Sequence, residues 1–245
     1  MSLHRTWATA GRVLRQLRHD PRTVGLLMAV PVVLMGILAW MLQGRDSDFE
    51  RFGLPLLGIF PLVVMFLVTS VTTLRERTSG TLERLLTMPI DKADFVLGYA
   101  LAFGSVAVVQ AAVVAGVSFG AFGLRAPGAA GLVVVVAVAD ALLGTALGLA
   151  LSALASTEFQ AVQFMPAFIL PQVLLCGFIV PRPEMPAFLR WLSDVLPMSY
   201  AVDATKKLAV SSHPGAGFWG DLAVVGAFVA AALLIGSLTL RRRTS

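Results

Sequence analysis

Long apolar runs separated by short polar stretches dominate this chain of 245 residues. As a helix rising about 1.5 Å per residue, each run is long enough to cross the roughly 30 Å hydrocarbon core of a bilayer. The runs are continuous and do not alternate as barrel strands do, so helices are expected. The pattern predicts an all-α polytopic membrane protein whose six transmembrane helices cover residues 24–43, 54–74, 96–120, 129–155, 159–180 and 218–240.

The composition agrees with this pattern. Hydrophobic residues make up 57% of the chain, and the mean hydropathy is +0.83. Soluble domains are usually about 45–50% apolar, and a soluble core of this size could not bury the excess. We therefore treat residues 1–245 as a single transmembrane domain.

The first 22 residues are amphipathic. Apolar and basic residues occupy opposite arcs of a helix turning about 100° per residue. No apolar core precedes Val24, so a signal peptide is not expected. The pattern predicts an interfacial helix with Trp7 at headgroup depth. Its apolar arc holds Leu3, Trp7, Ala10, Val13, Leu14 and Leu17, and its basic arc holds Arg5, Arg12, Arg15, Arg18 and Arg22.

Basic residues also predict the orientation. Twelve of the nineteen Lys and Arg residues lie in the N-terminal arm, in the 75–95 loop and at the C-terminus. Short segments rich in Lys and Arg stay in the cytoplasm, so both termini and this loop are expected there. The net charge of +5 then reflects topology and contact with anionic membrane lipids. Nucleic acid is not an expected partner, because no basic patch is interleaved with stacking aromatic residues.

The 75–95 loop is unusually charged, with eight charged residues between Arg75 and Asp94. Leu82, Leu85 and Leu86 would give a short helix one apolar face, and Pro89 would end it. This combination predicts a docking surface. An ordinary solvated turn between two helices is the alternative.

Residues 181–217 are too long and too patterned for a simple loop. Pro181, Pro183 and Pro186 exclude a continuous helix at its start. AFLRWLSDVL and SYAVDATKKLAV predict two short helices on either side of Pro197. We expect re-entrant extracellular elements, covered by protein where they enter the outer leaflet.

Polar groups and prolines within the second and fifth runs indicate a pathway. Pro166 and Pro171 free backbone carbonyls and kink the fifth run. A plain structural kink is the alternative. The expected pathway residues are Thr69, Thr73, Gln163, Phe168 and Gln172.

Asp140 lies near the centre of the fourth run, where a carboxylate costs about 2.5–3.5 kcal/mol. It is expected to face the bundle interior, either as a packing residue or as a proton or cation site. No basic partner is evident, which favours packing. Two GxxxG pairs, Gly116 with Gly120 and Gly144 with Gly148, predict close helix contacts.

Several kinds of chemistry are not expected. GxxxxGK[ST], GxSxG and HExxH are all absent, so neither a P-loop nucleotide site nor a hydrolase site is predicted. Cys176 is the single cysteine and the three histidines are scattered, which argues against a metal site and excludes an intrachain disulfide. No catalytic residue is therefore assigned.

RERTSGTLERLLTMP, at 75–89, resembles the charged signature of type-2 ATP-binding-cassette exporter permeases. LPMSYAVDATKKL, at 196–208, is similar to a second, looser signature of that family. Met88 and the Thr78–Ser79 spacer depart from the first signature without removing the resemblance. Six spans, a basic amphipathic N-terminal helix and short helices before the last span also fit.

The resemblance implies one transmembrane half of an ATP-driven exporter of amphiphilic cargo in a bacterial cell membrane. A second permease half, identical or paralogous, would pair with it. Two copies of a soluble P-loop ATPase subunit would dock underneath and hold ATP and Mg, so this chain would bind no cofactor. The coupling residues would be Arg75, Glu76, Arg77, Gly80, Thr81, Leu82, Glu83, Leu85, Leu86 and Pro89.

Two other classes of protein are alternatives. A proton- or ion-coupled secondary transporter would use Asp140, but no convincing internal repeat relates residues 24–120 to 129–240. A membrane anchor without transport would not explain kinked spans that carry amides.

Overall fold

The computed structural model describes residues 3–79, 92–126, 130–211 and 213–239. These residues are mostly helical and contain no strand, so the all-α prediction is confirmed for them. The elements in chain order are α1 (Leu3–Arg18), α2 (Pro21–Met41), α3 (Asp46–Thr78), α5 (Lys92–Gly120), α6 (Ala130–Ser152), α7 (Glu158–Leu175), the 3₁₀ turn η1 (Arg182–Glu184), α8 (Ala187–Val195), α9 (Pro197–Val210) and α10 (Ala216–Thr239).

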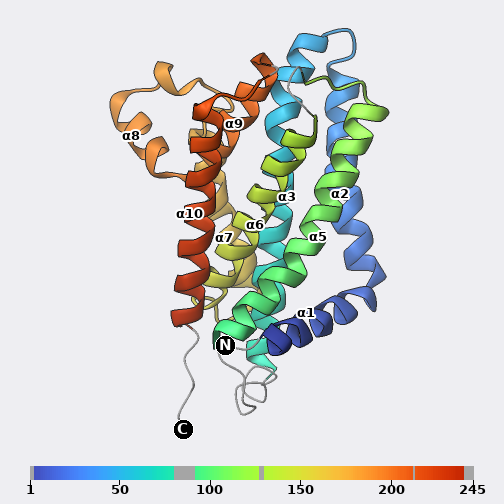
Figure 1. Cartoon of the computed structure of the whole chain (residues 1–245), viewed down its shortest axis with the longest axis vertical. Helices are drawn as coiled ribbons and strands as arrows, with labels where there is room; N and C mark the ends of the chain where they lie inside the picture. Colours follow the sequence, from blue (N-terminus) through green and yellow to red (C-terminus); the bar gives the residue numbers. More distant parts are fainter. Residues whose placement is uncertain (1–2, 80–91, 127–129, 212, 240–245) are drawn as a thin grey trace.

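The long helices form an elongated bundle (Figure 1). α1 lies across one end, here called the α1 end, and α8 and α9 lie at the opposite end, the α8 end. The described part of α10 finishes at the α1 end, so the chain returns to the side where it started. The first and last described helices therefore lie at the same end of the bundle.

Within the described residues, five helices are long and apolar enough to cross a membrane: α2, α3, α5, α6 and α10. The fifth predicted run corresponds to α7, which ends at Leu175 and not at 180. α7 falls outside the five because Gln160, Gln163 and Gln172 reduce its hydropathy. It nevertheless runs from the α1 end to the α8 end (Figure 1). Beyond it, Gly177 has a φ of +82°, a left-handed conformation that favours glycine.

α3 and α6 form the central seam of the bundle. A Cβ atom at Gly144 would lie 2.2 Å from the Leu62 carbonyl oxygen, and one at Gly148 would lie 2.7 Å from that of Phe66. The two helices therefore touch backbone to backbone, as the second GxxxG pair predicted. Gly116 and Gly120 make no such contact within the described chain, because a Cβ at either position would have no neighbour within 4 Å.

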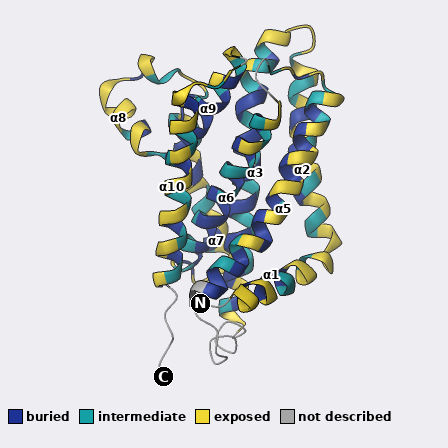
Figure 2. Cartoon of the chain, viewed as in Figure 1, coloured by how far each residue is buried: buried dark blue, intermediate teal, exposed yellow. Residues whose placement is uncertain are grey.

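Burial separates the inner helices from the outer ones (Figure 2). In the most apolar stretch of α3 and of α6, 61% of residues are buried, against 17% in α2 and in α10. The outer faces of α2 and α10 are apolar, with Leu34, Ile37 and Leu234 exposed. These faces suit contact with lipid chains.

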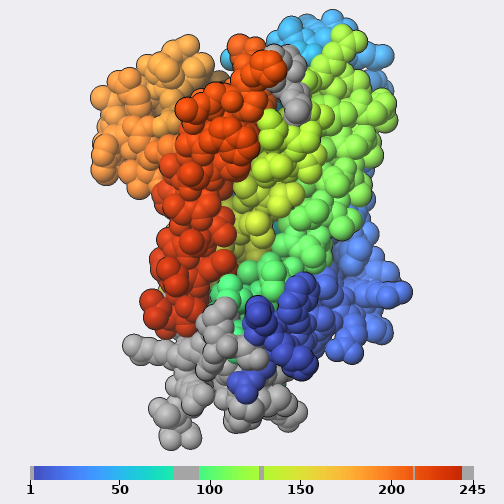
Figure 3. All heavy atoms as spheres, viewed as in Figure 1, coloured from blue at the N-terminus to red at the C-terminus, as the bar shows by residue number. Residues whose placement is uncertain are grey.

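The two short helices expected after Pro186 are present as α8 and α9. α9 packs against α3 and α10, with Met198, Ala201 and Leu208 buried. α8 projects from the side of the bundle (Figure 3) and exposes Phe188 and Trp191. Only α9 is therefore covered by the rest of the described chain.

Candidate functional site

α1 is seated directly on the start of α5. A Cβ atom at Gly98 would lie 2.6 Å from the Thr9 Cβ atom, so the close approach requires glycine. Thr6 adds a hydrogen bond to Asp94 at 3.3 Å. The predicted apolar arc of α1 divides between two surroundings. Ala10 and Val13 are buried in the protein, whereas Leu3 and Trp7 are exposed, where lipid would reach them.

A buried ionic cluster joins α1, α3 and α5. Arg12 donates from Nη1 to Glu76 Oε1 at 2.8 Å and from Nη2 to Glu76 Oε2 at 3.1 Å. Arg12 Nη2 also reaches the Tyr99 hydroxyl at 3.1 Å, and that hydroxyl donates to Glu76. We call Arg12, Glu76 and Tyr99 the clamp. Arg12 belongs to the predicted basic arc of α1, and its guanidinium bonds to a buried carboxylate on α3.

Electrostatics keeps Arg12 of the clamp charged. Partial burial lowers the pKa of Arg12, but the hydrogen bond from its side chain to Glu76 and the nearby negative charge outweigh this and raise the pKa overall. The arginine therefore stays protonated. A bidentate arginine–carboxylate pair with a third hydrogen-bonding group holds three helices at fixed angles.

Two further arginines fasten the end of α3 to the turn between α6 and α7. Arg75 donates to both Glu158 carboxylate oxygens, at 3.0 and 3.1 Å, on the exposed surface. Arg77 donates to the Ser152 carbonyl at 2.6 Å. The last turn of α3 is thus bonded to four other helices: α1 and α5 through Glu76, α6 through Arg77 and α7 through Arg75.

The predicted coupling residues divide into two groups. Arg75, Glu76 and Arg77 are described, and each bonds to another part of the chain. Glu76 is only 4% exposed, so it is placed to hold helices together and does not present a docking surface. The remaining predicted coupling residues lie outside the described residues: Gly80, Thr81, Leu82, Glu83, Leu85, Leu86 and Pro89.

The predicted pathway residues do not gather in one place within this chain. Thr69 and Thr73 are buried in α3, and Thr69 packs against Gly148 of α6. Gln163 and Phe168 lie on the exposed face of α7. Gln172 is buried, and its side-chain amide donates to the Phe168 carbonyl at 3.1 Å. The structure thus keeps the threonines apart from Gln163 and Phe168.

Asp140 faces the bundle interior, as expected. It is 1% exposed, and its Oδ2 atom would lie 2.6 Å from a Cβ at Gly58 of α3. Glycine at position 58 therefore makes room for the carboxyl group. Its Oδ1 atom has no hydrogen-bond partner among the described residues, and no described basic residue pairs with it. This geometry fits a packing residue better than a proton relay.

A second ionic network holds the α8 end. Arg182 of η1 pairs with Asp194 of α8 and Asp203 of α9. Its guanidinium also lies 5.5 Å from the centroid of the Tyr200 ring, in a cation–π contact. Burial lowers the pKa of Arg182, but the two carboxylates raise it overall, so it stays charged.

The sequence did not single out Arg12, Tyr99 or Arg182 for these roles. Arg12 belonged to a basic stripe, and Tyr99 stood within an apolar run. Glu76 could have indicated the clamp, because it is a carboxylate three residues after Thr73, at the edge of the apolar run 54–74. A carboxylate at that depth needs a cationic partner.

The fold is that of a multi-pass helical membrane protein, and the clamp bonds the end of α3 to the start of α5 and to α1. Residues 4–208 match the family model of the ABC-2 type transporter. The chain therefore belongs to the ABC-2 type transporter family, which confirms the resemblance carried by its two signatures.

Relatives agree with this assignment. The chain is 31% identical over 164 residues to the probable multidrug ABC transporter permease YbhR of Escherichia coli strain K12, covering 66% of this chain and 45% of that protein. It is 22% identical over 235 residues to the linearmycin resistance permease protein LnrN of Bacillus subtilis, covering 96% and 59%. The chain thus spans about half the length of these relatives. The secondary-transporter alternative gains no support.

Proposed function

We propose that this chain is the transmembrane subunit of an ATP-driven exporter and is itself not an ATPase. The main structural support for this proposal is the clamp of Arg12, Glu76 and Tyr99. The signature at 75–89 begins in the last turn of α3 and continues into the segment before α5. Glu76 and Tyr99 join the two flanks of that segment to each other, and Arg12 joins them to α1. A push on that segment would therefore move three helices as one body.

The proposed assembly contains two soluble P-loop ATPase subunits, which hold ATP and Mg, and a second permease half. The family and the names of the relatives support a permease role. In this assembly the α1 end faces the cytoplasm of a bacterial cell, and the segment after Thr78 is the coupling helix.

ATP hydrolysis tests this proposal. The purified chain alone is expected to hydrolyse no ATP, and the complex with an ATPase encoded beside it is expected to do so. The control is the same complex with the Walker lysine of the ATPase replaced. Hydrolysis by the chain alone, purified in the absence of any ATPase, would contradict the proposal.

We further propose that α7 is a sixth span. Its 18 residues extend about 27 Å, close to the hydrocarbon thickness. It also connects the α1 end to the α8 end (Figure 1). Its polar amides and two prolines are tolerated in a membrane where a helix borders protein or a water-filled cavity and not lipid alone.

The exposed face of α7 is the proposed contact with the second permease half. One stripe of this helix is exposed within the described chain, at helical spacing: Phe159, Val162, Gln163, Pro166, Ala167, Leu170, Pro171 and Leu174. Gln163, on this stripe, would then line a pathway between the halves, together with Phe168, which is exposed beside the stripe. A route of amides and aromatic rings with few charges suits an amphiphilic cargo.

Disulfide cross-linking tests this interface. Cys176 is the single cysteine, so its replacement by alanine gives a clean background. Ala167→Cys is expected to give an oxidised dimer if two copies pair. Ala231→Cys, exposed on α10, is the control. If the second half is a paralogue, we expect Ala167→Cys to form a disulfide-linked heterodimer with a cysteine introduced on the matching face of that paralogue. Cross-linking of Ala231→Cys alone would place the interface elsewhere.

A further inference from the structure

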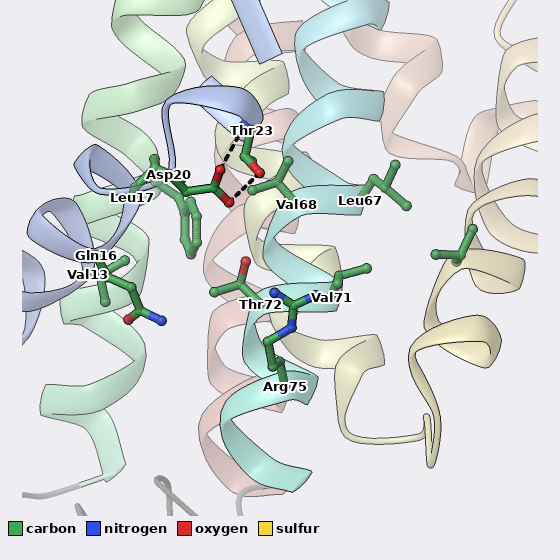
Figure 4. Close-up of a pocket in the computed structure, with 12 residues that line it drawn as sticks. Val13, Gln16, Leu17, Asp20, Thr23, Leu67, Val68, Val71, Thr72 and Arg75 are labelled. Carbon is green, nitrogen blue, oxygen red and sulfur yellow. Dashed lines mark hydrogen bonds between the residues drawn. The ribbon is translucent and has the colours of Figure 1, made fainter. Parts of the chain in front are cut away.

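A pocket of about 300 Å³ lies between the α1–α2 corner and α3 (Figure 4). This volume is at the lower end of the range for pockets that bind small molecules. Aliphatic and aromatic side chains from three long helices line it, among them Val68, Val71 and Phe103. Val13 and Leu17 close it from α1. The pocket is therefore apolar along the bundle and bounded by the helix expected at the membrane interface.

Two opposite charges border the same pocket. Asp20, at the corner, accepts hydrogen bonds from the Thr23 backbone and hydroxyl at 3.1 and 2.6 Å. These bonds lower the pKa of Asp20, so it is ionised at neutral pH. Arg75 projects from α3 on the facing wall (Figure 4). Its bonds to Glu158 use Nε and Nη2.

Asp20 and Arg75 do not pair with each other. Each takes a different partner although both line one pocket. Gln16, Thr23 and Thr72 add hydrogen-bonding groups between them. The site thus offers the Asp20 carboxylate, the Arg75 guanidinium with its Nη1 group free to donate, and neutral polar groups. Apolar side chains, among them Val68 and Val71, line the rest of the pocket and form its apolar floor.

We propose that this pocket binds the head group and upper chains of a zwitterionic phospholipid with an ethanolamine head. Asp20 takes the ammonium group, Arg75 takes the phosphate, and the acyl chains lie along Val68 and Val71. The lipid belongs to the leaflet at the α1 end, which is the inner one in the proposed topology. An anionic lipid with a glycerol head could satisfy Arg75 but would give Asp20 no cation.

This lipid would have a second consequence. Arg75 begins the family signature, and it joins α3 to α7 through Glu158. A phosphate on Nη1 would add a third hydrogen bond, and a second partner beside Glu158, to the same guanidinium. The occupied pocket therefore stabilises the end of α3 that the clamp also holds.

Native mass spectrometry of the full-length protein in detergent tests the proposal. The protein is titrated separately with phosphatidylethanolamine, phosphatidylglycerol and free phosphoethanolamine. We expect one phosphatidylethanolamine per chain, retained about tenfold more strongly than phosphatidylglycerol, because a charge-assisted hydrogen bond is lost with the latter. Free phosphoethanolamine is expected to bind much more weakly, since it makes no contact with the apolar floor.

Two variants locate the site. Asp20→Asn keeps a side-chain acceptor for Thr23 and is expected to lower phosphatidylethanolamine affinity about tenfold without changing phosphatidylglycerol. Val68→Trp fills the pocket and is expected to abolish specific binding. Val33→Trp, on the exposed face of α2, is its matched control. Thermal midpoints confirm that each variant is folded.

The outcomes are decisive. Equal retention of the two lipids, unchanged binding by Asp20→Asn, or equally strong binding of free phosphoethanolamine would each overturn the proposal. Because the experiment measures lipid binding without an ATPase, its failure would leave the proposed export function untouched.

Discussion

The two ends of the bundle are fastened by the same chemistry in different surroundings. At the α1 end, Arg12 meets a Glu76 side chain that is 5% exposed and is covered by Tyr99. At the α8 end, Arg182 meets Asp194 and Asp203, whose side chains are 51% and 28% exposed. On the acidic side, the first pair excludes water and the second network is partly open to it. On the basic side, Arg182 is better covered than Arg12, at 17% against 30% exposed.

This difference sets how firmly each end is held. Breaking a buried ion pair strands a charge away from water, whereas exposed pairs contribute little because solvent screens them. The α1 end is therefore the rigid end, and the α8 end is the one whose helices separate more easily.

The largest expected effect comes from breaking the clamp. Glu76→Leu leaves Arg12 without its acid and is expected to destabilise the protein by about 3 kcal/mol. The measurement is thermal or denaturant unfolding in detergent. Arg12→Met combined with Glu76→Leu is expected to recover most of that loss, because a well-packed apolar pair replaces the ions. A neutral effect of the single variant would remove the asymmetry.

The second effect is on transport alone. Glu83→Arg is expected to abolish coupled transport while insertion and thermal stability persist, if the signature segment docks on an ATPase. A solvated turn would instead tolerate the change within about 0.5 kcal/mol and without loss of transport. Export measured in vesicles with the ATPase present distinguishes the two. Glu50→Arg, at the opposite end, is the charge-reversal control.

A smaller effect is expected at the α8 end. Arg182→Gln keeps a donor but loses the charge shared by two half-exposed carboxylates, and should cost about 1 kcal/mol. Unfolding in detergent measures it beside Glu76→Leu. A loss equal to or greater than that of the clamp variant would reverse the order of the two ends.

The smallest effect on export and stability is expected from a substitution at Asp140, which lies in α6 between the two ends of the bundle. Asp140→Asn keeps size and hydrogen-bonding capacity while removing a charge that is costly in a membrane. ATP-driven export is expected to persist with the proton gradient collapsed, with equal or slightly higher thermal stability. A folded but inactive variant, from a parent that requires the gradient, would reinstate a proton-coupled carrier.

The sequence predicted the features that depend on local pattern. Apolar length located the long helices, proline positions separated α8 from α9, and glycine spacing found the contact of Gly144 and Gly148 with α3. It did not predict the clamp, because Arg12 and Glu76 are 64 positions apart and meet only through tertiary packing. Spacing alone also could not tell the packed glycine pair from Gly116 and Gly120, because it says nothing about whether another helix lies opposite.

The contact of Gly144 with Leu62 has a mechanical consequence. Pro61, the preceding residue, lacks the amide hydrogen that would complete the helical bonding of α3, and such a position is a natural bending point. α6 presses on the chain immediately after it, with no side chain between them to give way. This contact with α6 therefore restrains α3 from bending at Pro61. The 33-residue helix is about 50 Å long. If α3 rotates as a rigid body by about 5° about one end, its other end moves by about 4 Å.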